Sequence, residues 1–181
     1  MKSVIAETID IITEKSPTPL QDVWIDDLVI GIFFTGVKLS TGHAGVAFTP
    51  IGEIPEAVCC PTTAARMPQA GNLEGSPVSE ILKYALDTNV LKSAIGVATL
   101  NALSQWIVES EKENEYHMIK EADGFDPTAS LIPDVFFKRD VHVMAGVRIS
   151  DPDGMIKILK QGGSAYHLLK ECSEKIAFIK T

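Results

Sequence analysis

The stretch AIGVATLNALSQW (residues 94–106) has the composition of a buried helix, yet the amide of Asn101 interrupts its apolar run. At about 100° per residue, the large apolar side chains fall on one arc of this helix. The opposite arc holds Asn101 with mostly small or polar residues, namely Ala94, Val97, Ala98, Ser104, Gln105 and Val108. Small residues permit the close approach of another backbone, whereas a solvent-facing arc usually carries Lys and Glu. A second packed surface and plain exposure are both open.

Composition limits the classes of protein to consider. The chain has 181 residues, of which 45% are hydrophobic, so it can bury a substantial core. Its net charge of −8 and its lack of clustered Lys and Arg argue against a nucleic-acid partner. The apolar run LVIGIFF (residues 28–34) is too short to span a bilayer, and the N-terminal residues do not resemble a signal peptide. We therefore expect a cytoplasmic protein that makes no contact with a membrane.

The first part of the chain predicts the element order β-β-β-α-α after a helix at residues 3–15. The stretch VWIDDLVIGIFFTGVKLS (23–40) contains two strand-like runs, which we expect to be hinged near Asp26 and Asp27, and AGVAFTPI (44–51) supplies a third. Residues 61–77 have the composition of a long irregular connection. Helices are predicted at residues 77–87 and 90–108.

The second part begins after a densely charged segment, ESEKENEYHMIKEADGFDP (109–127), which predicts either a solvated continuation of the helix or a mobile linker. A strand is predicted at VHVMAGVRI (141–149), followed by a helix that begins at Asp151 and Pro152 and ends at Gly162 and Gly163. A short helix (164–172) and a closing strand, KIAFIK, complete the chain. We divide the chain into residues 1–108, a linker at 109–130, and residues 131–181.

Three segments carry a resemblance to a known family: GHAGVAFTP (42–50), GNLEGSPVSEILKYALDTNVLKSAIGVATLNAL (71–103) and PDVFFKRDVHVMAGVRISDPDGMIKILKQGG (133–163). They resemble the family called putative heavy-metal chelation, whose members join an enolase-N-terminal-like domain to a Rossmann-like domain. The resemblance covers residues 3–108 and resumes at about 131–181. It implies an α+β or α/β fold in which an enolase-N-terminal-like domain precedes a shortened Rossmann-like strand–helix remnant.

The same resemblance implies a cleft between the two parts that binds a transition-metal ion or a small metallocofactor. This chain has only about twenty residues, mostly charged, where the family has several strand–helix units. Because those units usually provide the glycine-rich turn that holds a pyrophosphate, we expect no nucleotide. The remnant would also expose a sheet edge, which predicts a homodimer.

Three side chains are candidate metal ligands. His43 lies in a predicted turn between strands, where a side chain can reach a ligand, although a loop histidine is more often a simple surface residue. Thiolates of Cys59 and Cys60 would suit a soft metal. Adjacent residues of an extended chain point to opposite faces, and Pro61 favours extended geometry at Cys60, so both are not expected to bind one ion.

Other residues are candidates for contacts with a bound molecule. Arg148 lies near the end of a predicted strand, where α/β folds place ligands, although an ion pair with a carboxylate would also explain it. Glu74 lies on the long connection and Asn101 on the small-residue arc, while Gly162 and Gly163 permit close backbone approach or simply end a helix.

Three hypotheses of function follow. The first is a metal- or metallocofactor-binding accessory protein. The second is a shortened, non-enzymatic interaction or regulatory subunit that has lost the site. The third is an enzyme acting on a small molecule, for which the sequence shows neither a nucleophile–base pair nor a phosphate-binding loop.

Overall fold

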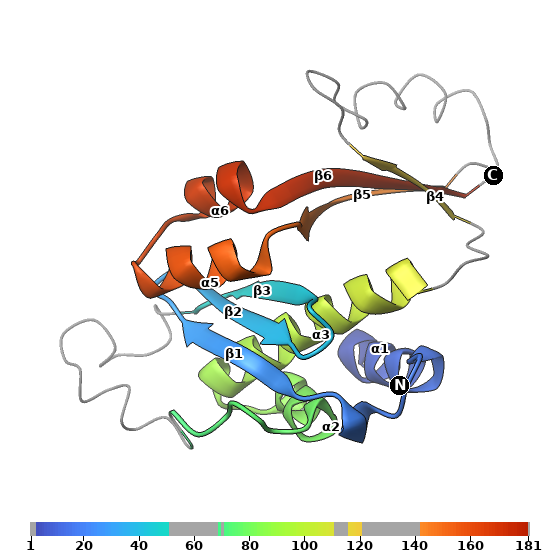
Figure 1. Cartoon of the computed structure of the whole chain (residues 1–181). Coiled ribbons are helices and arrows are strands. Elements are labelled where there is room, and N and C mark those ends of the chain that lie inside the picture. Colours follow the sequence, from blue (N-terminus) through green and yellow to red (C-terminus); the bar gives the residue numbers. More distant parts are fainter. Residues whose placement is uncertain (1–2, 51–68, 70, 111–115, 121–141, 181) are drawn as a thin grey trace.

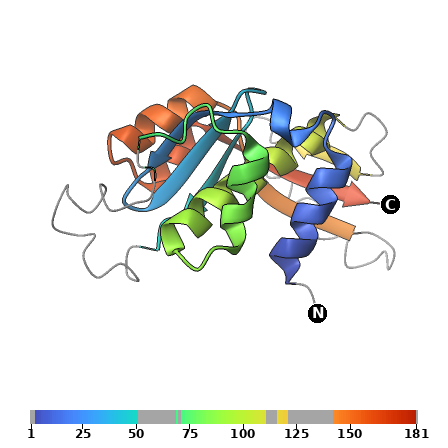
Figure 2. The same ribbon diagram turned by 90° about the horizontal axis from the view of Figure 1, so that it is seen from below.

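The computed structural model of the chain describes residues 3–50, 69, 71–110, 116–120 and 142–180. In this part of the chain, helices cover both faces of a central antiparallel sheet (Figures 1 and 2). Helices α1 (Val4–Lys15), α2 (Val78–Ile81) and α3 (Val90–Ser110) lie on one face, and α5 (Pro152–Lys160) lies on the other. The expected mixture of helices and strands is confirmed, and the strands of the central sheet are antiparallel.

The central sheet has the strand order β1–β2–β3, formed by Ile25–Ile30, Phe34–Leu39 and Ala44–Phe48. The hinge expected near Asp26 and Asp27 was wrong, because both residues lie within β1 and the chain turns between Ile30 and Phe34. A shift of register between Ile25 and Asp27 marks a bulge there. A bulge leaves the strand continuous while it redirects side chains, which is why a charged pair interrupts the apolar pattern without ending the strand.

The helices that precede and follow the sheet form the main core with it. Ser3 caps α1 by accepting a hydrogen bond from the backbone of Ala6, as the predicted first helix requires. The segment predicted as one helix at 77–87 is instead the single turn α2 followed by the 3₁₀ helix η4 (Leu82–Leu86). Large side chains from the sheet and from these helices are buried together: Ile25, Val37, Leu39, Ile81, Ile95 and Leu103.

Helix α3 packs unusually close to two of its neighbours, β3 and η4. A Cβ atom added to Gly45 of β3 would lie 2.3 Å from the carbonyl oxygen of Ala98 and 2.5 Å from the backbone nitrogen of Ala102. At Gly96, a Cβ atom would lie 2.0 Å from the backbone nitrogen of Ala85 in η4. Ala98 lies on the small-residue arc, so this arc is a packed surface against β3, whereas Gly96 lies on another side of the helix, where the backbone of η4 approaches.

Asn101 has a definite place on this surface. Its Nδ2 donates a hydrogen bond of 2.8 Å to the carbonyl oxygen of Val46. Strand β3 is at the edge of its sheet, so this bond satisfies a carbonyl on an edge strand. The Asn101 side chain is otherwise exposed, which answers why an amide interrupts the apolar run.

The C-terminal part consists of α5, α6 (Ala165–Glu171) and a second antiparallel sheet of order β4–β6–β5, formed by Tyr116–Lys120, Ser173–Lys180 and His142–Ile149. The predicted strand at 141–149 and both predicted helices are confirmed. Strand β4 lies inside the segment expected to be a helix continuation or a linker, and α3 ends at Ser110. Five residues between charged flanks are too few to show a strand pattern, whereas pairing with β6 satisfies their backbone.

Helix α5 packs on the face of the central sheet opposite α3. At Gly36 of β2, an added Cβ atom would lie 2.3 Å from a methyl carbon of Leu159 and 3.1 Å from the terminal methyl of Met155. Ion pairs join the same layers, because Lys38 contacts Asp153 at 2.8 Å and Lys160 contacts Asp27 at 2.8 Å. Among the residues described, no helix has the length and apolar character needed to cross a membrane.

We predict that Gly45→Ala will lower the free energy of unfolding by about 3 kcal/mol or more. The added methyl group meets backbone atoms of α3, which cannot move aside as a flexible side chain can, and overpacking of a core typically costs about 1–3 kcal/mol. Urea unfolding followed by circular dichroism measures this change. Gly71→Ala is the control. A Cβ atom there meets nothing within 4 Å, so the substitution adds only the backbone strain of an alanine at a φ of 80°. Equal losses in both variants would contradict the close packing of α3 on β3.

Candidate functional site

The turn between β2 and β3 holds His43 in a fixed orientation. Its backbone carbonyl accepts a hydrogen bond from Leu39, and Gly42 adopts the positive φ of 84° that the turn needs. The Nδ1 atom of His43 lies 3.0 Å from the hydroxyl oxygen of Thr41, so the Nε2 atom faces away from the turn. The His43 side chain is 17% exposed, and the centroid of its ring lies 6.4 Å from the ring centroid of Trp106.

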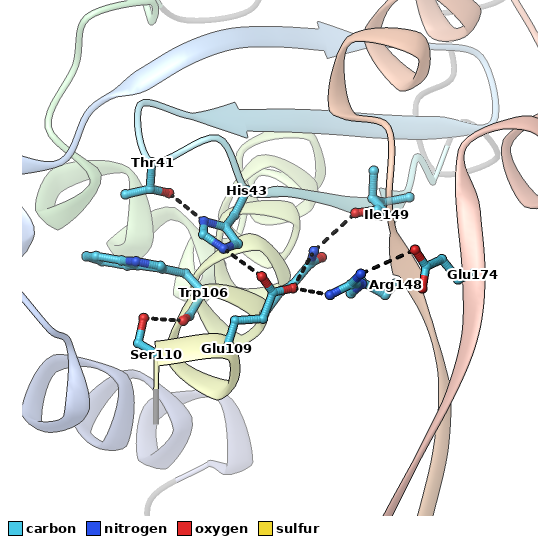
Figure 3. Close-up of polar contacts among 9 residues, drawn as sticks. Thr41, His43, Trp106, Glu109, Ser110, Arg148, Ile149 and Glu174 are labelled. Carbon is cyan, nitrogen blue, oxygen red and sulfur yellow. Dashed lines mark hydrogen bonds and ion pairs between the residues drawn. The ribbon is translucent and has the colours of Figure 1, made fainter. Parts of the chain in front are cut away.

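Glu109, in the last turn of α3, faces His43. One carboxylate oxygen, Oε2, lies 3.2 Å from Nε2 of His43 (Figure 3). The other oxygen, Oε1, accepts a hydrogen bond of 3.3 Å from Gln105, one helical turn earlier. Because α3 lies directly on β3, its last turn comes beside the β2–β3 turn, and residues 66 positions apart in the chain meet.

Arg148 brings the C-terminal sheet to the same carboxylate. It lies on β5, its side chain is 13% exposed, and its guanidinium contacts Oε1 of Glu109 at 2.5 Å and Glu174 at 3.2 Å (Figure 3). Glu174 is its partner across the β5–β6 pair. Gln105 strengthens the junction by donating a hydrogen bond of 3.1 Å to the carbonyl oxygen of Ile149, the last residue of β5.

The charges around Glu109 keep its carboxylate ionised. Burial by itself would raise the pKa of Glu109, but the positive charge of Arg148 and the contacts with His43 and Gln105 outweigh burial and hold the pKa below its ordinary value. The group therefore presents a full negative charge to His43 at neutral pH. A carboxylate that faces an imidazole nitrogen is a pair of donors suited to a divalent metal.

The distance between the two donor atoms fits a shared metal ion. Zinc lies about 2.0–2.2 Å from nitrogen and oxygen ligands, so two ligands of a tetrahedral ion are roughly 3.3 Å apart. The separation of 3.2 Å between Nε2 of His43 and Oε2 of Glu109 is that of a direct hydrogen bond or ion pair, and it is also close to this value. Within the described residues, no group of three or more His, Cys, Asp or Glu side chains could hold a metal ion. The described residues thus bring together two donors of this kind, His43 and Glu109, and any further ligand of a bound ion would come from water or from other residues.

The structure brings together only some of the residues singled out from the sequence. His43 and Arg148 meet through Glu109, whereas Cys59 and Cys60 lie outside the described residues. Glu74 is exposed on the connection before α2. The pKa of Lys160 is raised mainly by its hydrogen bond with Asp27, and the negative charge of Glu74 adds a smaller effect in the same direction.

Three further candidates have structural contacts that explain them, and their role in ligand binding stays a prediction. Asn101 bonds to Val46. Gly162, at a φ of 73°, and Gly163 donate backbone hydrogen bonds to Leu159 and Ile158 and so end α5.

Sequence analysis missed Glu109, which it assigned to the charged linker. The spacing of four residues between Gln105 and Glu109 was a usable signal, because it places both on one face if the helix continues. Glu174 offered no local signal, since only the pairing of β5 with β6 sets it opposite Arg148.

Comparison with known proteins identifies related sequences and folds. Two family models, each described as "Putative heavy-metal chelation", match residues 14–104 and 126–178. A solved structure of a DUF364-family protein of unknown function from Pyrococcus horikoshii is similar with a TM-score of 0.59 at 14% identity, over 98% of this chain and 100% of that one. This similarity shows a shared fold.

A second solved structure, also of a DUF364-family protein of unknown function, comes from Desulfitobacterium hafniense. The two structures give a TM-score of 0.44 at 20% sequence identity. The match covers 72% of this chain and 47% of that protein. The chain therefore corresponds to about half the length of this relative. A search of curated proteins found no match.

We predict that the stabilising effect of Glu109 depends on pH. Because the folded protein holds the pKa of Glu109 below its unfolded value of about 4.3, the ionised group stabilises the fold above that pH, and the effect is lost as pH falls through the lower folded value. The free energy of unfolding of Glu109→Gln should therefore lie below that of the wild type at pH 7, and the difference should shrink as the pH falls through the lowered pKa of Glu109. Urea titrations across this range test the prediction, with Glu80→Gln on the exposed side of α2 as control. A difference that does not change with pH would contradict it.

Proposed function

The chain belongs to the family described as putative heavy-metal chelation, and on that basis we propose that it binds a divalent transition-metal ion. The site that we propose includes Nε2 of His43 and Oε2 of Glu109. The observation that carries this proposal is their separation of 3.2 Å, which allows both atoms to bind one ion without movement of the backbone.

The part of the proposed site that lies in the described residues has two ligands and leaves coordination positions free, which suits an accessory protein that takes up and releases its metal. Structural zinc sites are closed by four protein ligands, whereas sites that act on an exchangeable ligand leave a position free. We propose that one of Cys59 and Cys60 completes the protein's share of the ligands. A thiolate beside an imidazole and a carboxylate would favour Zn²⁺, Co²⁺ or Ni²⁺ over Mg²⁺ or Ca²⁺.

The site is also proposed to be the remnant of a cleft between two domains. His43 belongs to the part that we assign as enolase-N-terminal-like (1–108), and Arg148 belongs to the shortened Rossmann-like part (131–181). Glu109 is the first residue of the segment assigned as the linker (109–130) and lies in the last turn of α3. The meeting of His43 and Arg148 at its carboxylate supports this assignment. In this scheme Asn101, Glu74, Gly162 and Gly163 would contact a larger metallocofactor, and the protein is a cytoplasmic homodimer that binds no nucleotide.

One observation favours a second function, that of a non-enzymatic interaction subunit. Arg148 already neutralises Oε1 of Glu109, as a residue would if its sole role were to join the two parts of the chain. Metal binding distinguishes the two proposals, because an interaction subunit would bind divalent ions no better than its surface carboxylates allow.

We predict that His43→Ala will weaken the binding of Co²⁺ and Zn²⁺ by at least about tenfold. Even residues that only orient a metal ligand are typically worth 10–100-fold in affinity, and His43 is proposed to be a ligand itself. Metal-stripped protein titrated with Co²⁺ and followed by absorption spectroscopy gives the affinity, and elemental analysis gives the stoichiometry. His167→Ala is the matched control, because that exposed histidine belongs to the capping box of α6.

The same titration tests the cysteines. We expect either Cys59→Ser or Cys60→Ser, and not both, to remove the thiolate-to-Co²⁺ absorption band, since adjacent residues of an extended chain point apart. Identical affinity and stoichiometry in the wild type and in His43→Ala would contradict the proposed function.

A further inference from the structure

Arg148 forms an ion pair with Glu109, the residue whose carboxylate is a proposed metal ligand. Its guanidinium binds Oε1 of Glu109, while Oε2 of the same group faces His43. Figure 3 shows the three side chains in a row, with Glu109 between the imidazole and the guanidinium. A single carboxylate is thus shared by a candidate metal ligand of the first part and a cation of the second.

The attachment of Arg148 is incomplete in a way that a purely structural ion pair would not need to be. Its Nε atom is buried and has no hydrogen-bond acceptor among the described residues. A buried donor without a partner costs free energy, so the contacts with Glu109 and Glu174 must offset that cost. If the contact with Glu109 were weakened, Arg148 would be held at the junction mainly by Glu174, and less of the cost of its unpaired Nε would be offset.

Arg148 shares the oxygen Oε1 of Glu109 with a second donor, Gln105. Gln105 donates to the same oxygen and also to the carbonyl oxygen of Ile149 on β5. The removal of Arg148 would therefore leave a contact that keeps Oε2 directed at His43. What the removal would change is charge, because Glu109 would lose the adjacent positive group that neutralises it.

We infer that Arg148 is a built-in cation that competes with the metal ion for Glu109, so that metal binding and the attachment of β5 to α3 oppose each other. This inference rests on the proposed function. A divalent ion at Oε2 would repel the guanidinium at Oε1 and draw electron density from the carboxylate. By linkage, whatever weakens the Arg148–Glu109 contact strengthens metal binding, and metal binding loosens that contact to the same extent.

Replacement of Arg148 by methionine tests the inference with Zn²⁺ or Co²⁺ alone as the probe. Methionine retains an unbranched chain of similar length and removes the charge. A neighbouring charge within about 4–6 Å changes the affinity of a carboxylate for a proton by one to three pKa units, and we expect an effect in the same direction on a cation. Arg148→Met should therefore bind the metal at least about tenfold more tightly than the wild type.

Arg148→Lys is the matched control, since it retains the positive charge and loses the planar fork of the guanidinium. If competition by charge is correct, its affinity stays within about threefold of the wild type. If Arg148 instead positions Glu109 for the metal, both variants bind more weakly, and that result overturns the inference.

Hydrogen exchange on the wild-type protein provides a second test that needs no Arg148 variant. Saturation with Zn²⁺ should speed exchange at the amides of Arg148 and Ile149 at the end of β5, and should leave α1 unchanged. The speeding should be absent in His43→Ala at the same Zn²⁺ concentration. Slower exchange at β5 on metal binding would overturn the inference, because it would mean that the metal strengthens the junction.

The outcomes separate this inference from the proposed function. If wild-type protein shows no metal binding that depends on His43, the proposed function is wrong and the inference fails with it. If that binding is present and Arg148→Met leaves it unchanged or weaker, only the inference is wrong.

Discussion

The close approach of helix α3 to strand β3 is the constraint on which the rest of the structure depends. Backbone atoms of Ala98 and Ala102 lie so near Gly45 that no side chain fits between them. Contact at this distance fixes how far along β3 the helix lies, and the amide of Asn101 fastens the same two elements through Val46. The last turn of α3 is thereby held beside the β2–β3 turn, where Glu109 meets His43.

The opposite face of the central sheet sets the position of the second charged partner. Helix α5 packs against Gly36 of β2, and the ion pairs of Lys38 and Lys160 with aspartates join the two layers. Strand β5 leads directly into this helix, so the packing of α5 limits where Arg148 can lie. The candidate site thus exists only where both parts of the chain meet, and a change in the packing of either part would alter it.

Much of the fold follows from local sequence patterns, but the meeting of the site residues does not. Capping residues such as Asp151 and turn glycines such as Gly42 mark where elements begin and end. The small-residue arc around Asn101 left a packed surface and plain exposure both open, and the structure shows β3 packed against this arc while Asn101 itself is exposed. The hinge was misplaced because a bulge at a charged pair looks like the end of a strand. His43 and Arg148 were identified singly, whereas Glu109, which joins them across 66 and 39 positions, became visible only once α3 was placed on the sheet.

The central claim is that one carboxylate, that of Glu109, is both a metal ligand and the link between the two parts of the protein. Anomalous diffraction from a crystal of the Co²⁺-loaded protein, measured on both sides of the cobalt absorption edge, tests it most directly. The account predicts a cobalt peak between Nε2 of His43 and Oε2 of Glu109, about 2.0–2.2 Å from each. A cobalt peak elsewhere, with His43 and Glu109 still in direct contact, would contradict it.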